Sequence, residues 1–283
     1  MITGNMQLRE LLRETICALA DNGIENARFE AEQLIEKAGI PKIKLISDPL
    51  TEIGEEVCEK VNEYCEKRLS GYPLQYILGE WEFCGLPFRV GEGVLIPRQD
   101  TETLAELCME YLRERPGETV LDLCSGSGCI GITLAKLCGA QAVLAELSEE
   151  ALLYLRENTE LNGVQEQCRI VSGNVLDDKL ISGEFGVIVS NPPYLTGEDM
   201  DRLQKEVSFE PTMALYGGND GLDFYRKLLP IYTKRLKIGG LFAVEIGINQ
   251  EQSVMKIFAE NGIEPFCEKD MCGIYRVVYG IKQ

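Results

Sequence analysis

Short apolar runs alternate with longer amphipathic stretches from residue 120 onward. The runs are typical of buried strands, and the stretches between them repeat their apolar residues at helical spacing. The predicted strands are 120–123, 142–146, 169–172, 187–190 and 241–246, and the predicted helices are 130–137, 149–162, 222–236 and 250–261. This alternation predicts an α/β fold with a doubly wound, mostly parallel sheet. Near the C-terminus, residues 266–270 and 275–279 predict an antiparallel pair that closes the sheet.

The first 98 residues follow other patterns. Residues 1–72 repeat apolar side chains at helical spacing, which predicts a small helical domain. Residues 73–98 divide into short extended pieces with glycine turns, which predicts a linker that contains a β-hairpin. Residues 99–283 then form the main domain, and we expect Asp100 or Thr101 to cap its first helix.

The composition excludes several kinds of chemistry. The 283-residue chain contains no histidine, which rules out Ser-His-Asp and Cys-His catalysis and His-based zinc sites. Its eleven cysteines are scattered and form no CxxC pair, so we predict no metal site and a reduced, cytoplasmic protein. No apolar stretch is long enough to span a bilayer. The net charge of -18 argues against tight binding to bare nucleic acid, which depends on neutralising phosphates.

A glycine-rich loop follows the first of these strands. The sequence VLDLCSGSGCIG places Gly126, Gly128 and Gly131 in a GxGxxG pattern between a strand and a helix, where bare backbone can approach a ligand. Glu146 ends the next strand, where a carboxylate can accept both hydrogens of a ribose diol. These features predict a nucleoside-type cofactor, and a tight turn with a surface glutamate is the alternative. The glycines alone fit a nicotinamide dinucleotide as well as S-adenosylmethionine.

Asp122, at the end of the first predicted strand, favours S-adenosylmethionine. Its carboxylate can meet the ammonium group of a methionine moiety, whereas a pyrophosphate beside it would be repelled. The competing interpretation makes Asp122 a cap for the following helix.

The strand at 187–190 ends in the sequence Asn-Pro-Pro-Tyr. Two adjacent prolines lack N–H groups and have a fixed φ, so they predict a rigid turn rather than a continued strand. Ligands bind beyond the carboxyl ends of the strands in such sheets, which places this turn beside the cofactor. The Asn191 side-chain oxygen and the Pro192 carbonyl can each accept one hydrogen of a planar –NH2 group. Pro193 helps to hold these acceptors in place, and Tyr194 can pack against a flat substrate.

This arrangement predicts methyl transfer to the nitrogen of a planar group. An amide nitrogen is a poor nucleophile because its lone pair is shared with the carbonyl. Two acceptors that pull on its hydrogens localise the lone pair and aim it at the sulfonium methyl group. No strong base is required, which suits a chain without histidine. The alternative is a loop made rigid for stability alone.

The NPPY sequence resembles the motif of class I methyltransferases that act on planar amino groups, namely the adenine-N6 and the protein-glutamine enzymes. Four longer segments resemble the bacterial release factor glutamine methyltransferase family: NARFEAEQLI at 26–35, PLQYILGEWEF at 73–83, LIPRQDTETL at 95–104 and FEPTMALYGGNDGLDFYR at 209–226. The resemblance runs nearly end to end. It implies a Rossmann-like class I methyltransferase domain with a mostly parallel seven-stranded sheet, and S-adenosyl-L-methionine as cofactor. It also implies methylation of the N5 nitrogen of the Gly-Gly-Gln glutamine in class 1 peptide chain release factors.

The resemblance also assigns roles to residues of this chain. The matching cofactor-binding positions are Cys124, Ser125, Gly126, Ser127, Gly128, Glu146, Asn174, Val175 and Asn191, and the matching catalytic and substrate-binding positions are Asn191, Pro192, Pro193 and Tyr194. The helical domain, residues 1–72, is the part expected to recognise the release factor. We expect no membrane partner and no sequence-specific nucleic acid partner.

Three positions depart from the residues usual in that family. Cys124 stands where glycine is usual, so we expect that the backbone there does not need a positive φ. Glu146 replaces an aspartate and is one methylene longer. Asn174 stands where an aspartate commonly accepts the adenine amino group, which its amide oxygen can still do. All three departures are expected to be tolerated.

Three other functions compete with this interpretation. An adenine-N6 methyltransferase would share the two acceptors at Asn191 and Pro192, here called the clamp. It would also extrude a base and bind phosphates, which the net charge of -18 disfavours. A non-enzymatic cofactor-binding or ribosome-associated adaptor would not need the intact clamp at Asn191. A nicotinamide-dependent dehydrogenase would use the glycine loop but would place Asp122 beside a pyrophosphate.

Overall fold

The computed structural model describes residues 6–283, which form two compact units. One unit comprises the chain up to Gly79 together with Lys205–Phe209, and the other comprises Glu80–Gln204 and Glu210–Gln283. The chain therefore returns from the second unit to the first for one short segment. The sequence-based division placed its first boundary at residue 72, whereas the first compact unit continues to Gly79.

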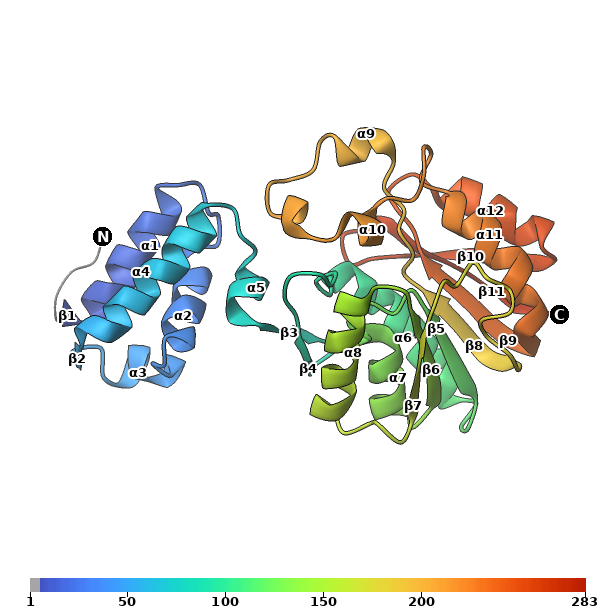
Figure 1. Ribbon diagram of the computed structural model, residues 1–283, viewed down its shortest axis with the longest axis horizontal. Coiled ribbons are helices and arrows are strands. Elements are labelled where there is room, and N and C mark those ends of the chain that lie inside the picture. Colours follow the sequence, from blue (N-terminus) through green and yellow to red (C-terminus); the bar gives the residue numbers. More distant parts are fainter. Residues whose placement is uncertain (1–5) are drawn as a thin grey trace. The chain divides into compact units, whose positions relative to one another are not determined.

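The first unit is helical. Its helices are α1 (Leu8–Ala20), α2 (Ala27–Lys37), α3 (Lys42–Ser47), α4 (Glu55–Leu69) and α5 (Leu74–Leu78) (Figure 1). Two short strands, β1 (Met6–Gln7) and β2 (Glu52–Ile53), pair antiparallel. α1 packs against α2 and α4, and leucine and valine side chains on these helices, Leu11, Leu34 and Val61, are fully buried. The helical character predicted for this part of the chain is confirmed.

A buried arginine anchors the segment that returns from the second unit. The Arg68 side chain, on α4, is only 4% exposed. Its Nε donates to Glu30 Oε2 at 2.6 Å, and its Nη2 donates to Glu206 Oε1 at 2.7 Å. The rings of Tyr72 and Phe209 also meet edge to face, with centroids 5.3 Å apart. Removing either carboxylate would leave a buried charge with fewer partners, so this segment is an integral part of the first unit.

The second unit is built on a seven-stranded sheet in the order β10-β11-β9-β8-β5-β6-β7. The strands are β5 (Thr119–Leu123), β6 (Gln141–Glu146), β7 (Cys168–Ser172), β8 (Phe185–Ser190), β9 (Leu236–Glu245), β10 (Ile263–Lys269) and β11 (Tyr275–Lys282). Neighbouring strands from β7 to β9 run parallel, and β11 is antiparallel to both β9 and β10. The mostly parallel seven-stranded sheet and the antiparallel C-terminal pair are thus confirmed.

Helices cover both faces of this sheet (Figure 1). The longer ones are α6 (Gln99–Arg113), α7 (Cys129–Cys138), α8 (Glu149–Leu161), α11 (Asp223–Tyr232) and α12 (Glu251–Glu260). Side chains alternate along each strand, so Val120 and Val187 enter the core shared with α6, α7 and α8, whereas Leu121 and Ile188 enter the core shared with α11 and α12. The hairpin, β3 (Glu80–Phe83) and β4 (Leu86–Arg89), precedes α6, and the short helices α9 (Gly197–Met200) and α10 (Thr212–Leu215) lie between β8 and α11.

The strand order reverses between β5 and β8. After β5 the chain winds outward through β6 and β7, and then returns to place β8 on the other side of β5. Leu123 of β5 is the register partner of Ser190 of β8, so Cys124 and Asn191 begin neighbouring loops at one edge of the sheet. Open α/β sheets bind ligands at such a switch point.

Three local predictions were wrong. Residues 74–78 form α5 rather than an extended piece, and Gly79 ends this helix at a φ of +74°. α6 begins at Gln99 with Arg98 at the N-cap, so neither predicted cap residue occupies that position. The helix expected to reach residue 236 ends at Tyr232, because a 3₁₀ turn intervenes before the long strand β9.

Within residues 6–283, no helix is both long and apolar enough to cross a membrane. All eleven cysteines are free thiols. The hairpin predicted ahead of α6 is confirmed by the antiparallel pairing of β3 with β4.

Candidate active site

The loop between β5 and α7 carries the glycines of the GxGxxG pattern. Gly126 and Gly128 have φ values of +55° and +82°, in the left-handed region that glycine enters without a Cβ penalty. A Cβ on Gly128 would lie 2.4 Å from Leu155 Cδ1, and one on Gly131 would lie 2.2 Å from Leu144 Cδ2. Gly126 therefore shapes the turn, while Gly128 and Gly131 allow α7 to pack closely against α8 and β6.

Cys124, the first residue of this loop, has a φ of +59°. The expectation that this position does not need a positive φ is therefore wrong, and the left-handed conformation of a residue with a Cβ costs about 1–2 kcal/mol. The next residue fixes the turn: the Ser125 N–H donates to the Ala145 carbonyl at 3.0 Å, and its hydroxyl donates to the Asp122 carbonyl at 2.9 Å. These buried hydrogen bonds help to offset the strain at Cys124.

Asp122 lies beneath the loop. Its side chain is buried, and Oδ2 accepts a hydrogen bond from the Gly131 N–H in the first turn of α7, at 2.9 Å. The capping contact weighed as an alternative is therefore present, and the contact with an ammonium group stays a prediction. Burial raises the pKa of Asp122 to about 7, although the Gly131 N–H acts to lower it. Oδ1 is buried and has no hydrogen-bond partner among the described residues, so it can still accept a donor.

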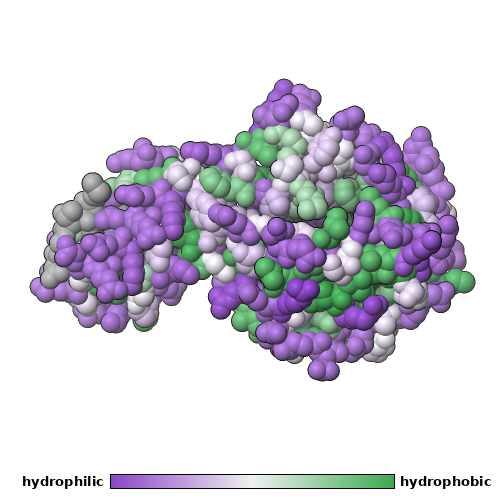
Figure 2. Space-filling model, viewed as in Figure 1, coloured by the Kyte–Doolittle hydropathy of each residue, from purple (hydrophilic) through white to green (hydrophobic). Residues whose placement is uncertain are grey.

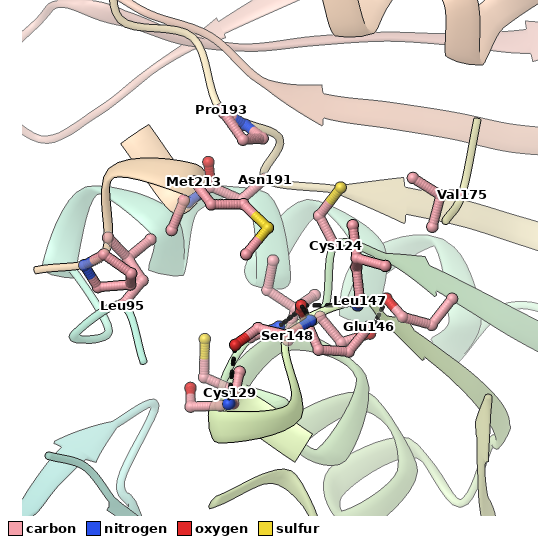
Figure 3. A pocket seen from close by; sticks show the side chains of 18 of the residues that line it. Leu95, Cys124, Cys129, Glu146, Leu147, Ser148, Val175, Asn191, Pro193 and Met213 are labelled. Atoms are coloured by element: carbon pink, nitrogen blue, oxygen red, sulfur yellow. Dashed lines mark hydrogen bonds between the residues drawn. The ribbon is translucent and has the colours of Figure 1, made fainter. Parts of the chain in front are cut away.

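Glu146 ends β6 directly beside the glycine loop. Its Oε2 accepts from the Gly126 N–H at 2.8 Å, and its Oε1 accepts from the N–H groups of Leu147 and Ser148, both at 2.8 Å (Figure 3). Three backbone donors thus hold the carboxylate in one orientation. The two donors on Oε1 occupy both of its lone pairs, whereas Oε2 keeps one, so the group can still accept a hydrogen bond from a ligand hydroxyl.

The loop after β7 supplies Asn174 and Val175. Val175 is buried and lines the pocket, whereas Asn174 is exposed at its edge. The Asn174 Oδ1 accepts from the Leu176 N–H at 2.9 Å, which fixes the amide and uses one of its two oxygen lone pairs. The second lone pair can meet an amino group of a ligand.

Asn191 follows β8 and faces the same pocket (Figure 3). Its Nδ2 donates to Thr101 Oγ1 at 3.3 Å, so its Oδ1 lies on the opposite side of the amide. Pro193 also lines the pocket. Pro192 and Tyr194 do not line it, and the predicted contact of Tyr194 with a flat substrate stays a prediction.

The backbone of the Asn-Pro-Pro-Tyr turn is held from behind. Gln250 Nε2 donates to the Tyr194 carbonyl at 3.0 Å. A Cβ on Gly217 would lie 2.5 Å from the Pro193 carbonyl oxygen, and one on Gly221 would lie 2.2 Å from that of Tyr194. The two glycines, from the segment YGGNDG, therefore let another part of the chain pack directly against the turn.

Most of the predicted site residues line one pocket, which encloses about 1120 Å³ of space with its mouth included. These are Cys124, Ser125, Gly126, Ser127, Glu146, Asn174, Val175, Asn191 and Pro193. The predicted residues that do not line it are Asp122, Gly128, Pro192 and Tyr194.

Two segments that the sequence marked only through resemblance form a further wall of the pocket, residues 95–98 and residues 211–214. Glu210 joins them, because its buried carboxylate accepts from the Ile96 N–H at 3.1 Å and from the Arg98 guanidinium. Figure 3 shows Leu95 and Met213, one from each segment, facing the pocket. The motifs LIPRQDTETL and FEPT thus meet in space.

Sequence reasoning missed four residues that support the site, Thr101, Glu210, Glu245 and Gln250. Thr101 and Glu210 lie within segments that carry the family resemblance, which was the one available signal for them. Glu245 ends an ordinary strand and Gln250 follows it, and nothing in their local pattern indicates a contact with the Asn-Pro-Pro-Tyr turn.

Two models of known protein families match the chain, and the first of them ends where the first compact unit passes into the second. Residues 10–79 match the family model described as PrmC N-terminal domain. Residues 97–210 match the family model described as Methyltransferase small domain.

Two relatives match most of the chain. A release factor glutamine methyltransferase of Geobacter sulfurreducens is 41% identical over 278 residues, which cover 96% of this chain and 96% of that protein. A protein of the same name from Clostridium acetobutylicum is 37% identical and covers 85% of this chain and 86% of its own length.

Among solved structures, the 16S rRNA N2 G1207 methyltransferase of Thermus thermophilus, in complex with AdoMet and guanosine, superposes with a TM-score of 0.52. The two sequences are 20% identical, and the match covers 72% of this chain and 50% of that one. This likeness concerns the fold, which is that of a methyltransferase domain.

Proposed function

This chain belongs to the release factor glutamine methyltransferase family, and from this we propose its reaction. It transfers a methyl group from S-adenosyl-L-methionine to the side-chain amide nitrogen (N5) of the glutamine in the Gly-Gly-Gln motif of class 1 peptide chain release factors. Family membership favours this reaction over methylation of adenine N6.

The observation that carries the proposal is the orientation of the Asn191 amide. Its nitrogen is engaged by Thr101, so its oxygen is the group left to accept a hydrogen bond within the pocket. The pocket is also lined by the glycine loop, from Cys124 to Ser127. An amide acceptor beside a nucleoside-binding loop is what methylation of a planar –NH2 group requires.

Several residues of the pocket fit the cofactor. The Glu146 carboxylate, already held by three backbone donors, would accept a ribose hydroxyl at the remaining lone pair of Oε2. Asn174 and Val175 would contact the adenine. Asp122 does not line the pocket, but its Oδ1 has no hydrogen-bond partner among the described residues and is the acceptor that we propose for the ammonium group. When bound, the cofactor supplies an electrophilic methyl group on a sulfonium.

The chain itself supplies position and electrostatics. The Asn191 Oδ1 and the carbonyl of Pro192, which stands between two residues that line the pocket, would each accept one hydrogen of the substrate amide. These contacts would localise the nitrogen lone pair and aim it at the methyl group. The nitrogen would form a bond to the methyl carbon as the bond between that carbon and the sulfonium sulfur breaks, which would release S-adenosylhomocysteine, and the nitrogen would lose one of its two hydrogens as a proton. No histidine is needed, because the acceptors only orient the nitrogen and a methylated amide nitrogen is acidic enough to release its proton to water.

Selection of the release factor is assigned to the first unit, because a glutamine side chain and two glycines offer little surface to the pocket. The face of this unit seen in Figure 2 is mainly hydrophilic. Glu59 and Glu66 of α4 are exposed and belong to a surplus of acidic side chains in this part of the chain. Such a surface would steer a basic partner toward the enzyme. A translation factor as substrate and eleven free thiols support a cytoplasmic location.

The decisive experiment is mass spectrometry of a purified class 1 release factor incubated with this protein and S-adenosylmethionine. We expect the mass of one methyl group on the glutamine of the Gly-Gly-Gln motif. The Asn191→Ala variant should bind the cofactor normally but turn over roughly 10²–10³-fold more slowly, as when a preorganised polar partner is removed. An unmodified release factor, with cofactor binding demonstrated by calorimetry, would refute the proposal.

A further inference from the structure

Thr101 is an unexpected neighbour of the Asn-Pro-Pro-Tyr turn. It lies in the first turn of α6, ninety positions before Asn191, and only 2% of its surface is exposed. Its Oγ1 accepts the hydrogen bond from Asn191 Nδ2 at 3.3 Å. A buried hydroxyl that accepts one hydrogen bond still carries a hydrogen of its own, which needs an acceptor.

Glu245, the last residue of β9, supplies that acceptor. Its carboxylate is 1% exposed, and the hydroxyls of Thr101 and Tyr194 both interact with it. The Tyr194 hydroxyl donates to Oε1 at 3.1 Å, while Oε2 has no hydrogen-bond partner among the described residues. Burial raises the pKa of Glu245 to about 7, and the two hydroxyl donors act to lower it, as expected when they stabilise the carboxylate.

The direction of these hydrogen bonds determines which end of the Asn191 amide faces the pocket. In its ionised form, which the two hydroxyl donors favour, Glu245 accepts and cannot donate, so the Thr101 hydrogen points toward it. The Thr101 oxygen is then left to accept, and only the –NH2 end of Asn191 can satisfy it. The Asn191 oxygen must therefore lie on the other side, where the pocket is.

We propose that Thr101 and Glu245 are positioning residues that set the orientation of the Asn191 amide, so that its oxygen rather than its nitrogen meets the substrate. This inference rests on the proposed function, because orientation matters only if Asn191 accepts a hydrogen from a substrate –NH2 group. With the amide reversed, two –NH2 groups would face each other, and the clamp would lose one of its two acceptors. Glu245 acts through Thr101 and touches neither substrate nor cofactor.

The hydrogen bonds that connect Glu245 through Thr101 to Asn191 are called the relay below. The test compares variants that remove the relay with variants that keep it. Thr101→Val removes the hydroxyl at nearly constant shape, and Thr101→Ser restores it. Glu245→Gln keeps the size of the side chain but adds a donor that can reverse the relay. It should still fold, because it removes a buried charge. Thr103→Val, from the same helix, is the matched control.

We expect Thr101→Val and Glu245→Gln to lower kcat for release factor methylation by about 10–100-fold, the usual effect of removing a group that orients a site residue. The KM for S-adenosylmethionine should stay within about twofold, and Thr101→Ser and Thr103→Val should behave like the wild type. Wild-type kcat in Thr101→Val would overturn the inference. So would an equal loss in Thr101→Val and Thr101→Ser, because packing alone would then explain it.

A second readout does not depend on activity. The side-chain amide resonance of Asn191, identified by its loss in Asn191→Ala, reports the partner of Nδ2 in an NMR spectrum of the full chain. It should shift in Thr101→Val and in Glu245→Gln but not in Thr103→Val. An unchanged resonance in both relay variants would overturn the inference even if the wild type methylates a release factor. A shifted resonance with no methylation by the wild type would support the relay and refute the proposed function.

Discussion

The side-chain amide of Gln250 connects two turns of the second unit. Its Nε2 donates to the Tyr194 carbonyl at 3.0 Å, and its Oε1 accepts from the Gly247 N–H at 2.9 Å. The backbone at the end of the Asn-Pro-Pro-Tyr turn is therefore tied to the loop that follows β9.

We expect Gln250→Ala to lower turnover roughly three- to tenfold, because one hydrogen bond to the turn is worth about 0.5–1.5 kcal/mol. Cofactor affinity, measured by calorimetry, should not change, since Gln250 does not line the pocket. Gln252→Ala, an exposed position on the same helix, serves as the control. Full turnover in Gln250→Ala would show that the prolines hold the turn without help.

Glu146→Ala should weaken S-adenosylmethionine binding by about tenfold or more, because charge-assisted hydrogen bonds contribute roughly 1.5–3 kcal/mol each. The loss of the contact to Gly126 should also loosen the loop. Calorimetric titration measures the affinity, and Glu160→Ala removes an equal charge from an exposed position. If both variants bind the cofactor like the wild type, Glu146 lies outside the cofactor site.

Gly221→Ala should destabilise the protein more than Gly139→Ala. Both glycines have a similar positive φ, +72° and +68°, so the backbone strain of alanine is matched. The new Cβ at Gly221 would lie 2.2 Å from the Tyr194 oxygen, whereas at Gly139 it meets nothing within 4 Å. Forced overpacking costs about 1–3 kcal/mol, which is the expected difference in the free energy of unfolding in urea. Equal free energies of unfolding would mean that the YGGNDG segment shifts to accommodate the new Cβ without a loss of stability.

Asp122→Asn should change how stability depends on pH. The pKa of Asp122 is raised by burial from an ordinary 3.8 to about 7, so the folded protein holds a proton in this range that the unfolded chain releases. This residue therefore lowers the free energy of unfolding as the pH rises from about 4 to about 7. Relative to the wild type, the variant should gain stability between pH 5 and pH 8. The free energy of unfolding of the variant and of the wild type is measured in urea at pH 5 and at pH 8. If the difference between the two proteins is the same at both pH values, the raised pKa of Asp122 is contradicted.

The acidic side of α4 should influence recognition of the release factor. Replacing Glu59 and Glu66 by glutamine should raise the KM for the factor a few-fold at low ionic strength, and the difference should disappear at high salt because exposed charges are screened. Replacing Glu157 and Glu160, exposed on α8 of the second unit, provides a control with the same loss of charge. An identical KM for both double variants would direct the search to other surfaces of the first unit.

The fold could be predicted because its signals are local. Alternating strands and helices, the glycines after β5 and the prolines after β8 each act within a few residues, and the structure confirms the sheet that they imply. Cys124 shows the limit of this reasoning, because its φ of +59° is imposed by the turn and not by its own preference.

The residues that hold the site in place could not be predicted, because their roles depend on contacts between distant parts of the chain. A threonine in the first turn of a helix resembles a cap, and Thr101 was interpreted in that way. Its partners are Asn191 and Glu245, which only the winding of the sheet brings to it. Likewise, the acidic Glu210 has the local pattern of an exposed residue, although its carboxylate is buried against Ile96 and Arg98.

The contact between Arg68 and Glu206 has a consequence for synthesis on the ribosome. The two residues are 138 positions apart. At about 5–20 residues per second, roughly 7–28 s pass between their emergence. During that time the nascent first unit has its arginine paired with Glu30 alone, and the ring of Tyr72 lacks Phe209. The N-terminal helices therefore cannot complete their packing as an independent early folding unit. Their final stability is acquired only after β8 and the Asn-Pro-Pro-Tyr turn have been made.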